Sequence, residues 1–111
     1  MVNINSIKWA IKVVSPNHPE LIRYDGIWVP GVCDDKTKTI FLSSHLYGYN
    51  LKKVLCHEIT HAVLFSYHID VPLEQEEALA DLISSYGEEI LATTNTLIAQ
   101  SGRLKCRPYF F

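Results

Sequence analysis

The chain has 111 residues, of which 48% are hydrophobic and 20% charged, and its formal net charge is −2. A chain of this length suits one folded domain, and this composition excludes a disordered chain. The small negative charge does not favour a nucleic-acid or membrane-surface partner, because such partners usually attract a basic excess.

The three cysteines, Cys33, Cys56 and Cys106, are odd in number and have no paired spacing. They do not indicate a disulfide framework, so a reducing compartment is the better fit. The first residues lack the basic and apolar regions of a signal peptide, and no apolar run approaches the roughly 20 residues that span a bilayer. We therefore expect a soluble cytoplasmic protein without a membrane or nucleic-acid partner.

The first half of the chain predicts a small antiparallel sheet of about three strands. Apolar and polar residues alternate from Ile7 to Val13, which predicts one strand within residues 1–15. Two prolines then end this strand in a loop. Because β-branched and aromatic residues dominate the alternation, the strand should be half-buried.

A hairpin is the next predicted element. Residues 20–24 predict a helical turn, and residues 26–42 predict two strands joined by a polar turn. Pro30 lies inside the first of these strands and cannot donate a ladder hydrogen bond. That strand should therefore lie at an edge of the sheet or carry a bulge.

Two long helices are predicted in the second half of the chain. Asn50 is a favourable N-cap for a helix over residues 50–67. The second helix, over residues 74–100, begins with three glutamates, and negative charge is stabilised at a helix N-terminus. Residues 103–111 form a basic and aromatic tail that should pack on the body or fray. The predicted fold class is α+β in a single domain.

The strongest chemical signal is the motif His57-Glu58-Ile59-Thr60-His61. Helix positions four apart lie on one face, so His57 and His61 can bind one zinc ion at about 2.0–2.1 Å. Glu58 lies beside the first ligand, where it can act as general base towards the attacking water. This HExxH pattern predicts a catalytic zinc site.

A catalytic zinc usually has three protein ligands and one open position, so we expect a third ligand on the second helix. Glu77 is the first choice, because the loop between the helices allows an antiparallel return. Asp81 follows one turn later and could accept the free ring N–H of a ligating imidazole, although Asp81 as the ligand itself stays open. Glu74 and Glu76 are weaker candidates, since Glu76 points about 100° away from Glu77 around the helix.

These residues resemble the ImmA/IrrE-like metallopeptidases of bacteria, phages and mobile elements, and more broadly the gluzincins. The resemblance covers about residues 31–90 and depends on the HExxH motif and on the Glu-Ala-x-x-Asp pattern from Glu77 to Asp81. It implies a minimal zincin-like fold, in which the sheet packs on the HExxH helix and the next helix. It also implies that the two motif histidines and Glu77 bind zinc, that Glu58 is the base, and that Asp81 contacts a ligating imidazole on the side away from the metal.

The predicted activity is metal-assisted hydrolysis of a peptide bond in a protein substrate. Members of the resembled family often act on repressors, which implies a repressor-type regulator as substrate. An extended substrate could pair with the strand at residues 40–42. A stabiliser of the oxyanion is expected among these tyrosines and histidines: Tyr86, Tyr67, Tyr47, Tyr49, His45 and His68.

Two other functional classes stay open. The chain could be a catalytically silent zinc-binding module of the same fold that binds a protein partner. It could also be a metal-free domain in which the motif occurs by chance. Zinc content separates the last class from the first two, and replacement of the general base separates hydrolysis from silent binding.

Overall fold

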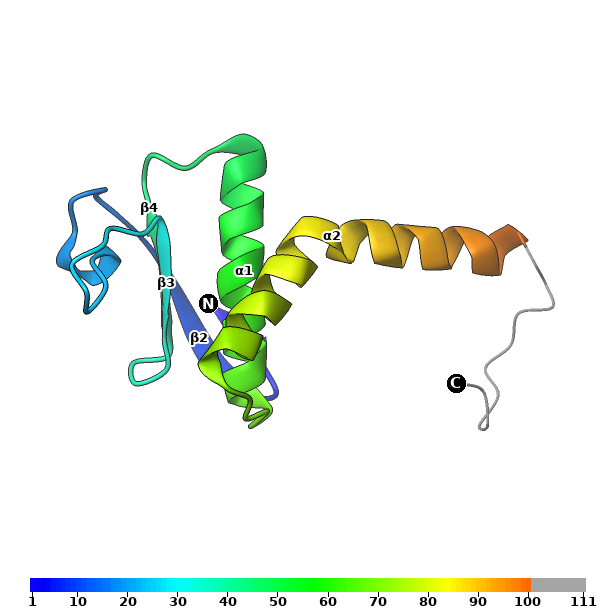
Figure 1. Cartoon of the computed structure of the whole chain (residues 1–111), viewed down its shortest axis with the longest axis horizontal. Helices are drawn as coiled ribbons and strands as arrows, with labels where there is room; N and C mark the ends of the chain where they lie inside the picture. Colours follow the sequence, from blue (N-terminus) through cyan, green and yellow to red (C-terminus); the bar gives the residue numbers. More distant parts are fainter. Residues whose placement is uncertain (101–111) are drawn as a thin grey trace.

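The computed structural model describes residues 1–100, which have the predicted α+β class. The elements in chain order are β1 (Val2–Ile4), β2 (Ile7–Val14), the short 3-10 helix η1 (Pro19–Leu21), β3 (Gly31–Asp34), β4 (Thr39–Ser43), α1 (Gly48–Ser66) and α2 (Leu73–Gln100). Figure 1 shows α1 on one face of the sheet and the η1 segment on the other, while α2 runs back along α1. The predicted tail at residues 103–111 lies outside the described residues.

The sheet has four strands in the order β1-β2-β4-β3, and it is mixed. The β1–β2 and β3–β4 pairs are antiparallel, but β2 and β4 are parallel. The prediction of about three antiparallel strands is therefore wrong in strand number and in the direction of the central pair. A parallel pair needs a long crossover connection, and the segment with η1 and β3 supplies it.

A tight hairpin divides the single strand predicted for residues 1–15 into β1 and β2. Asn5 and Ser6 have φ values of 50° and 64°, the left-handed conformation that two-residue hairpin turns require. The side-chain amide of Asn5 also donates to the backbone carbonyl of Ser66 at 2.9 Å. The turn thus ties the first hairpin to the end of α1.

The predicted second hairpin forms, but its strands are shorter than residues 26–42. Pairing begins at Gly31, while residues 26–30 form a loop that carries the isolated bridge between Ile22 and Trp28. The prediction that the strand next to Pro30 lies at an edge is confirmed, because β3 is the last strand of the sheet. The prediction that residues 40–42 offer a free edge is wrong, because β4 lies between β2 and β3.

The core joins β2 and β4 to α1. Trp9, Ile40 and Ala62 are fully buried and pack together with Leu42. The indole N–H of Trp9 donates to the buried Ser66 hydroxyl at 2.8 Å, so the largest core side chain leaves no polar group unpaired. These contacts fix the orientation of α1 relative to the sheet, and therefore the orientation of its motif.

Both predicted helices form; the ends of α1 lie within two residues of the expected ones, and α2 begins one residue early. Tyr47 takes the N-cap position of α1 with no side-chain cap bond, so the prediction of Asn50 as N-cap is wrong. The second half of α2 projects away from the domain (Figure 1). Within residues 1–100, no helix combines the length and the apolar character that crossing a membrane would need. The helical turn predicted at residues 20–24 forms slightly earlier, as η1.

Candidate metal centre

The two motif histidines point their Nε2 atoms towards each other. His57 and His61 lie one turn apart on α1, and their Nε2 atoms are 3.3 Å apart. His61 is buried, with 6% of its surface exposed, because α2 covers this face of α1. The regular helix alone brings the two rings together.

Glu77 on α2 places its carboxylate between these two nitrogens. Its Oε1 atom lies 2.9 Å from Nε2 of His61, and its Oε2 atom lies 3.3 Å from Nε2 of His57. One ligand atom from each of the three residues lies within 4.8 Å of the other two. The structure therefore brings together the three ligands predicted from the sequence.

The geometry and chemistry of this group fit zinc. Ligand atoms about 2.0–2.1 Å from a tetrahedral ion lie about 3.3 Å from one another, and the observed separations are 2.9 and 3.3 Å. Two imidazoles and one carboxylate are a known ligand set of catalytic zinc. Within residues 1–100 the group has three members, which leaves a fourth coordination position for water or substrate.

Carboxylates on α2 also hold the other nitrogen of each ring. Asp81 Oδ1 lies 3.1 Å from Nδ1 of His57, and Glu76 Oε2 lies 2.6 Å from Nδ1 of His61. A carboxylate only accepts, so each Nδ1 would donate to its carboxylate while each Nε2, with a metal bound, would offer its lone pair to the ion. The carboxylates of α2 thus hold the orientation of both rings.

Glu76 was predicted only as a weaker candidate for the third ligand, whereas the structure places it against Nδ1 of His61. Its angular separation from Glu77 suggested a lesser ligand, but the same separation lets it reach the far side of His61. Ala80, one turn after Glu76, is fully buried, so the stripe through both residues faces α1. Ala80, a small residue one turn after Glu76, was the sequence signal that could have indicated that Glu76 faces α1. Glu74 is exposed and lies outside the group.

Glu58 follows His57 on α1 and lines the same cleft as the two histidines. Only 7% of its surface is exposed. Burial is the main cause that raises the pKa of Glu58 to about 7; the nearby His61 opposes this shift and the charge of Glu77 adds to it. A carboxyl group with a pKa near neutrality can both accept and return a proton.

Gly31 allows the strand to approach Glu58 closely. A Cβ atom at Gly31 would lie 2.8 Å from Cγ1 of Val54 and 3.2 Å from Cγ of Glu58. The missing side chain therefore sets the distance between the edge strand β3 and α1. No sequence motif marks this position, because the constraint comes from a tertiary contact.

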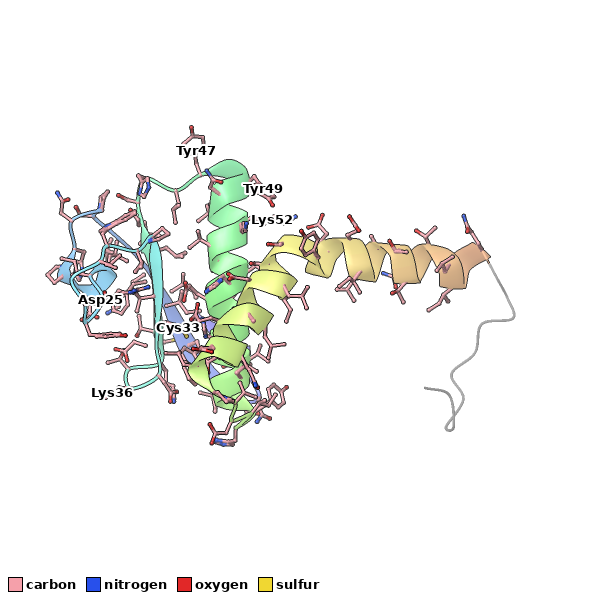
Figure 2. The ribbon with its side chains drawn as sticks, in the orientation of Figure 1. Asp25, Cys33, Lys36, Tyr47, Tyr49 and Lys52 are labelled. Carbon is pink, nitrogen blue, oxygen red and sulfur yellow. The ribbon has the colours of Figure 1, made fainter. Side chains whose placement is uncertain are left out.

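A cleft of about 680 Å³ runs between β3, α1 and the start of α2. It contains the predicted ligands and Glu58, and Cys33 of β3 lies on the wall that faces α1 (Figure 2). None of the three preferred oxyanion candidates, Tyr86, Tyr67 and Tyr47, lines it. Figure 2 shows Tyr47 and Tyr49 at the N-terminal end of α1, away from the cleft.

The remaining candidates also lie elsewhere. His45 contacts the Ser43 hydroxyl and packs against Trp28, and His68 follows the end of α1. Within residues 1–100, the tyrosine that does line the cleft is Tyr24, in the loop after η1, and its side chain is almost fully exposed.

Comparisons with protein-family models, with curated proteins and with solved structures give no significant match.

Proposed function

We propose that this protein is a zinc-dependent peptidase of minimal zincin-like architecture, with His57, His61 and Glu77 as metal ligands. One observation carries the proposal: two imidazole Nε2 atoms and one carboxylate converge, while both Nδ1 atoms are held by other carboxylates. A network built only for stability would not need both Nε2 atoms and the Glu77 carboxylate to converge on one point. The resemblance of the motif to ImmA/IrrE-like metallopeptidases agrees with this reading.

A zinc ion bound here would polarise the scissile carbonyl and lower the pKa of the attacking water to about 7. Glu58 would take the proton of that water and return it to the leaving amine. Its burial keeps its pKa close to neutrality, so one residue can serve in both steps. Asp81 and Glu76 would hold the imidazoles in place during the reaction.

The free edge of β3 is the element that would bind an extended substrate. Strand addition supplies backbone hydrogen bonds for a peptide of any sequence, and the edge runs beside Glu58 at Gly31. The residues that line the cleft would then determine which side chains of the substrate fit. A protein with an exposed extended segment, such as the repressor-type regulator implied by the resemblance, is the proposed substrate class.

Replacement of Glu58 by Gln tests the hydrolytic function. The zinc-loaded protein should cleave members of a mixed peptide library, with products identified by mass spectrometry, and Glu58→Gln should lower the rate by about 10²–10⁴-fold. Zinc content should stay at one per chain, because Glu58 is not among the grouped ligand residues. Glu74→Gln is the matched control, since Glu74 is exposed on α2 outside the group.

Three results would contradict the proposal. If the unaltered protein and Glu58→Gln both bind zinc but neither cleaves any peptide, the protein is a silent zinc-binding module; if both cleave at the same rate, Glu58 is not the general base. If neither binds zinc, the motif does not form a metal centre.

A further inference from the structure

The cleft contains two cationic side chains that the reaction described above does not use. Lys53 lies on α1, one turn before His57, and Arg23 lies in the loop between η1 and β3. Both line the cleft that contains Glu58 and the grouped ligand residues. Lys53 comes from α1, and Arg23 comes from the loop that leads from η1 to the edge strand β3.

Lys53 carries a charge that no described residue balances. It forms no ion pair within residues 1–100, whereas its neighbour Lys52 pairs with Glu88 of α2. Positions four apart on a helix have Cβ atoms about 5–6 Å apart, so the ammonium group of Lys53 can reach the space in front of His57. Its position is exposed at the mouth of the cleft.

Arg23 is held in place by its backbone. Its N–H donates to the carbonyl of Ile27 at 2.8 Å, and its own carbonyl accepts from Gly26 at 2.8 Å. Gly26 has a φ of 81°, which a glycine adopts without strain in this turn. The preceding Leu21 is fully buried and anchors the loop on the sheet.

The side chain of Arg23 pairs with Asp25 through its Nε and Nη2 atoms. Asp25 is the main cause that raises the pKa of Arg23, through a hydrogen bond and its charge, and the charge of Glu77 adds to this effect. The Arg23 guanidinium is about half-exposed, with 47% of the side chain accessible, so it retains donors for a second carboxylate.

Two of the three acidic residues of the cleft, Glu76 and Glu77, already have partners, and the third, Glu58, is buried. Glu76 is bonded to His61, and Glu77 lies between the two imidazoles. The opposite end of the cleft is apolar, with Phe65 and Leu73 on its walls. Apart from the proposed metal, the cationic side chains that line the cleft within residues 1–100 are Lys53 and Arg23, and a carboxylate on a bound molecule would find favourable charge beside them.

We propose that Lys53 and Arg23 bind a carboxylate of the substrate, so that the cleft prefers a peptide with an acidic side chain close to the scissile bond. This inference rests on the proposed metal centre, because the metal defines where the scissile bond lies. Lys53 would contribute most, since its charge is unpaired, and Arg23 would contribute less because Asp25 already occupies part of its fork. Both would act as specificity residues rather than as catalytic residues.

The test uses paired small molecules on the zinc-loaded full chain. Monohydroxamates of succinic, glutaric and adipic acid each carry a metal-binding group and a carboxylate, and their carboxamide analogues have the same shape without the charge. Dissociation constants are measured by isothermal titration calorimetry at low salt. In the unaltered protein, the best carboxylate should bind about 10-fold tighter than its carboxamide, and the preference should shrink as salt is raised.

Variants then locate the charge that is responsible. Lys53→Gln should reduce the preference to about 2-fold or less, Lys53→Glu should reverse it, and Arg23→Gln should reduce it partly. Lys36→Gln is the matched control, because Lys36 lies in the exposed turn between β3 and β4 (Figure 2). This substitution removes the same charge, but outside the cleft. The control should keep the full preference.

The outcomes separate the two proposals. If the carboxamides bind the zinc-loaded protein but the carboxylates bind no tighter, or if Lys53→Gln and Arg23→Gln leave the preference intact, the inference is overturned while the metal centre stands. If the chain takes up no zinc, or if no hydroxamate of either kind binds, the metal centre and the inference built on it both fail.

Discussion

Glu58 combines burial with a position beside the ligands, and that combination has a measurable consequence for stability. Its pKa is raised to about 7 in the folded chain, chiefly by burial, against an ordinary value of 4.5. The folded state therefore holds the proton more tightly than the unfolded state. The stability that the protonated carboxyl group provides is present below about pH 4.5 and is lost as the pH rises through about 7.

The variant Glu58→Gln should remove this pH dependence in the metal-free protein. At pH 8 the variant should be more stable than the unaltered chain, by about 3 kcal/mol at most, because a neutral amide replaces a buried charge. Near pH 4 the two should be equally stable. Urea unfolding with a chelator present, at both pH values, measures the difference, and a difference that does not change with pH would contradict the assignment.

Gly31 provides a second prediction at this scale. Gly31→Ala should destabilise the chain by about 1–3 kcal/mol, because Val54 is β-branched and cannot easily move away from the added methyl group. Zinc affinity should change little, since no ligand contacts Gly31, but peptidase activity should fall as Glu58 shifts. Urea unfolding and a zinc titration measure the two effects.

Gly87→Ala serves as the comparison for Gly31→Ala. There the added methyl group would lie 3.3 Å from Cγ2 of Ile83, a side chain that is partly exposed on α2. The gain in helix propensity, up to about 1 kcal/mol, should offset that contact. Equal losses at both glycines would show that Gly31 has no special role.

Local spacing predicted part of the site. The helix period alone relates His57 to His61 and Glu77 to Asp81, so these pairs are visible in the sequence. The roles of Glu76, Lys53 and Gly31 were not predicted, because these roles depend on which faces of α1, α2 and β3 meet. Such contacts join residues distant in the chain, and a single sequence does not encode them as a local pattern.

At the scale of elements, the helices were more predictable than the sheet. Both helices have long periodic patterns, and both ends of α1 and the start of α2 lie within two residues of the predicted positions. The parallel pairing of β2 with β4 joins strands that are separated by the η1 segment and β3. The β1–β2 turn uses Asn-Ser rather than Asn-Gly, so the usual hairpin signal is weak.

The second half of α2 should contribute little to the stability of the domain. Leu91 is 66% exposed there, whereas Leu42 in the core is 2% exposed. Leu91→Gln, which keeps helix propensity, should change the free energy of unfolding by less than about 0.5 kcal/mol. Leu42→Ala should cost about 2–5 kcal/mol. Comparable losses in urea unfolding would mean that another surface covers this face of α2.

At the scale of the whole molecule, the proposed metal would connect two helices that are otherwise joined by packing, a short loop and side-chain pairs such as Lys52–Glu88. Its ligands come from α1 and α2, so zinc should bind the folded state far more tightly than the unfolded chain. Free zinc at 100 times its dissociation constant should add about 2.7 kcal/mol to stability. Thermal unfolding with and without zinc measures this, and Glu77→Gln should lose most of the gain.

The surroundings of the metal give a more direct answer than stability does. Protonated imidazoles paired with carboxylates would produce some of the same contacts without any ion, and the cleft also contains Cys33, whose thiol could compete for zinc. Zinc–nitrogen and zinc–oxygen bonds are about 2.0–2.1 Å long, while zinc–sulfur bonds are about 2.3 Å, so the two ligand sets are easily distinguished.

X-ray absorption at the zinc edge, on the full chain loaded with one equivalent of zinc, tests the central claim. We predict a four-coordinate shell of nitrogen and oxygen at about 2.0–2.1 Å, with the scattering of two imidazoles and no sulfur. A sulfur ligand, fewer than two imidazoles, or the six-coordinate spectrum of hydrated zinc would contradict it.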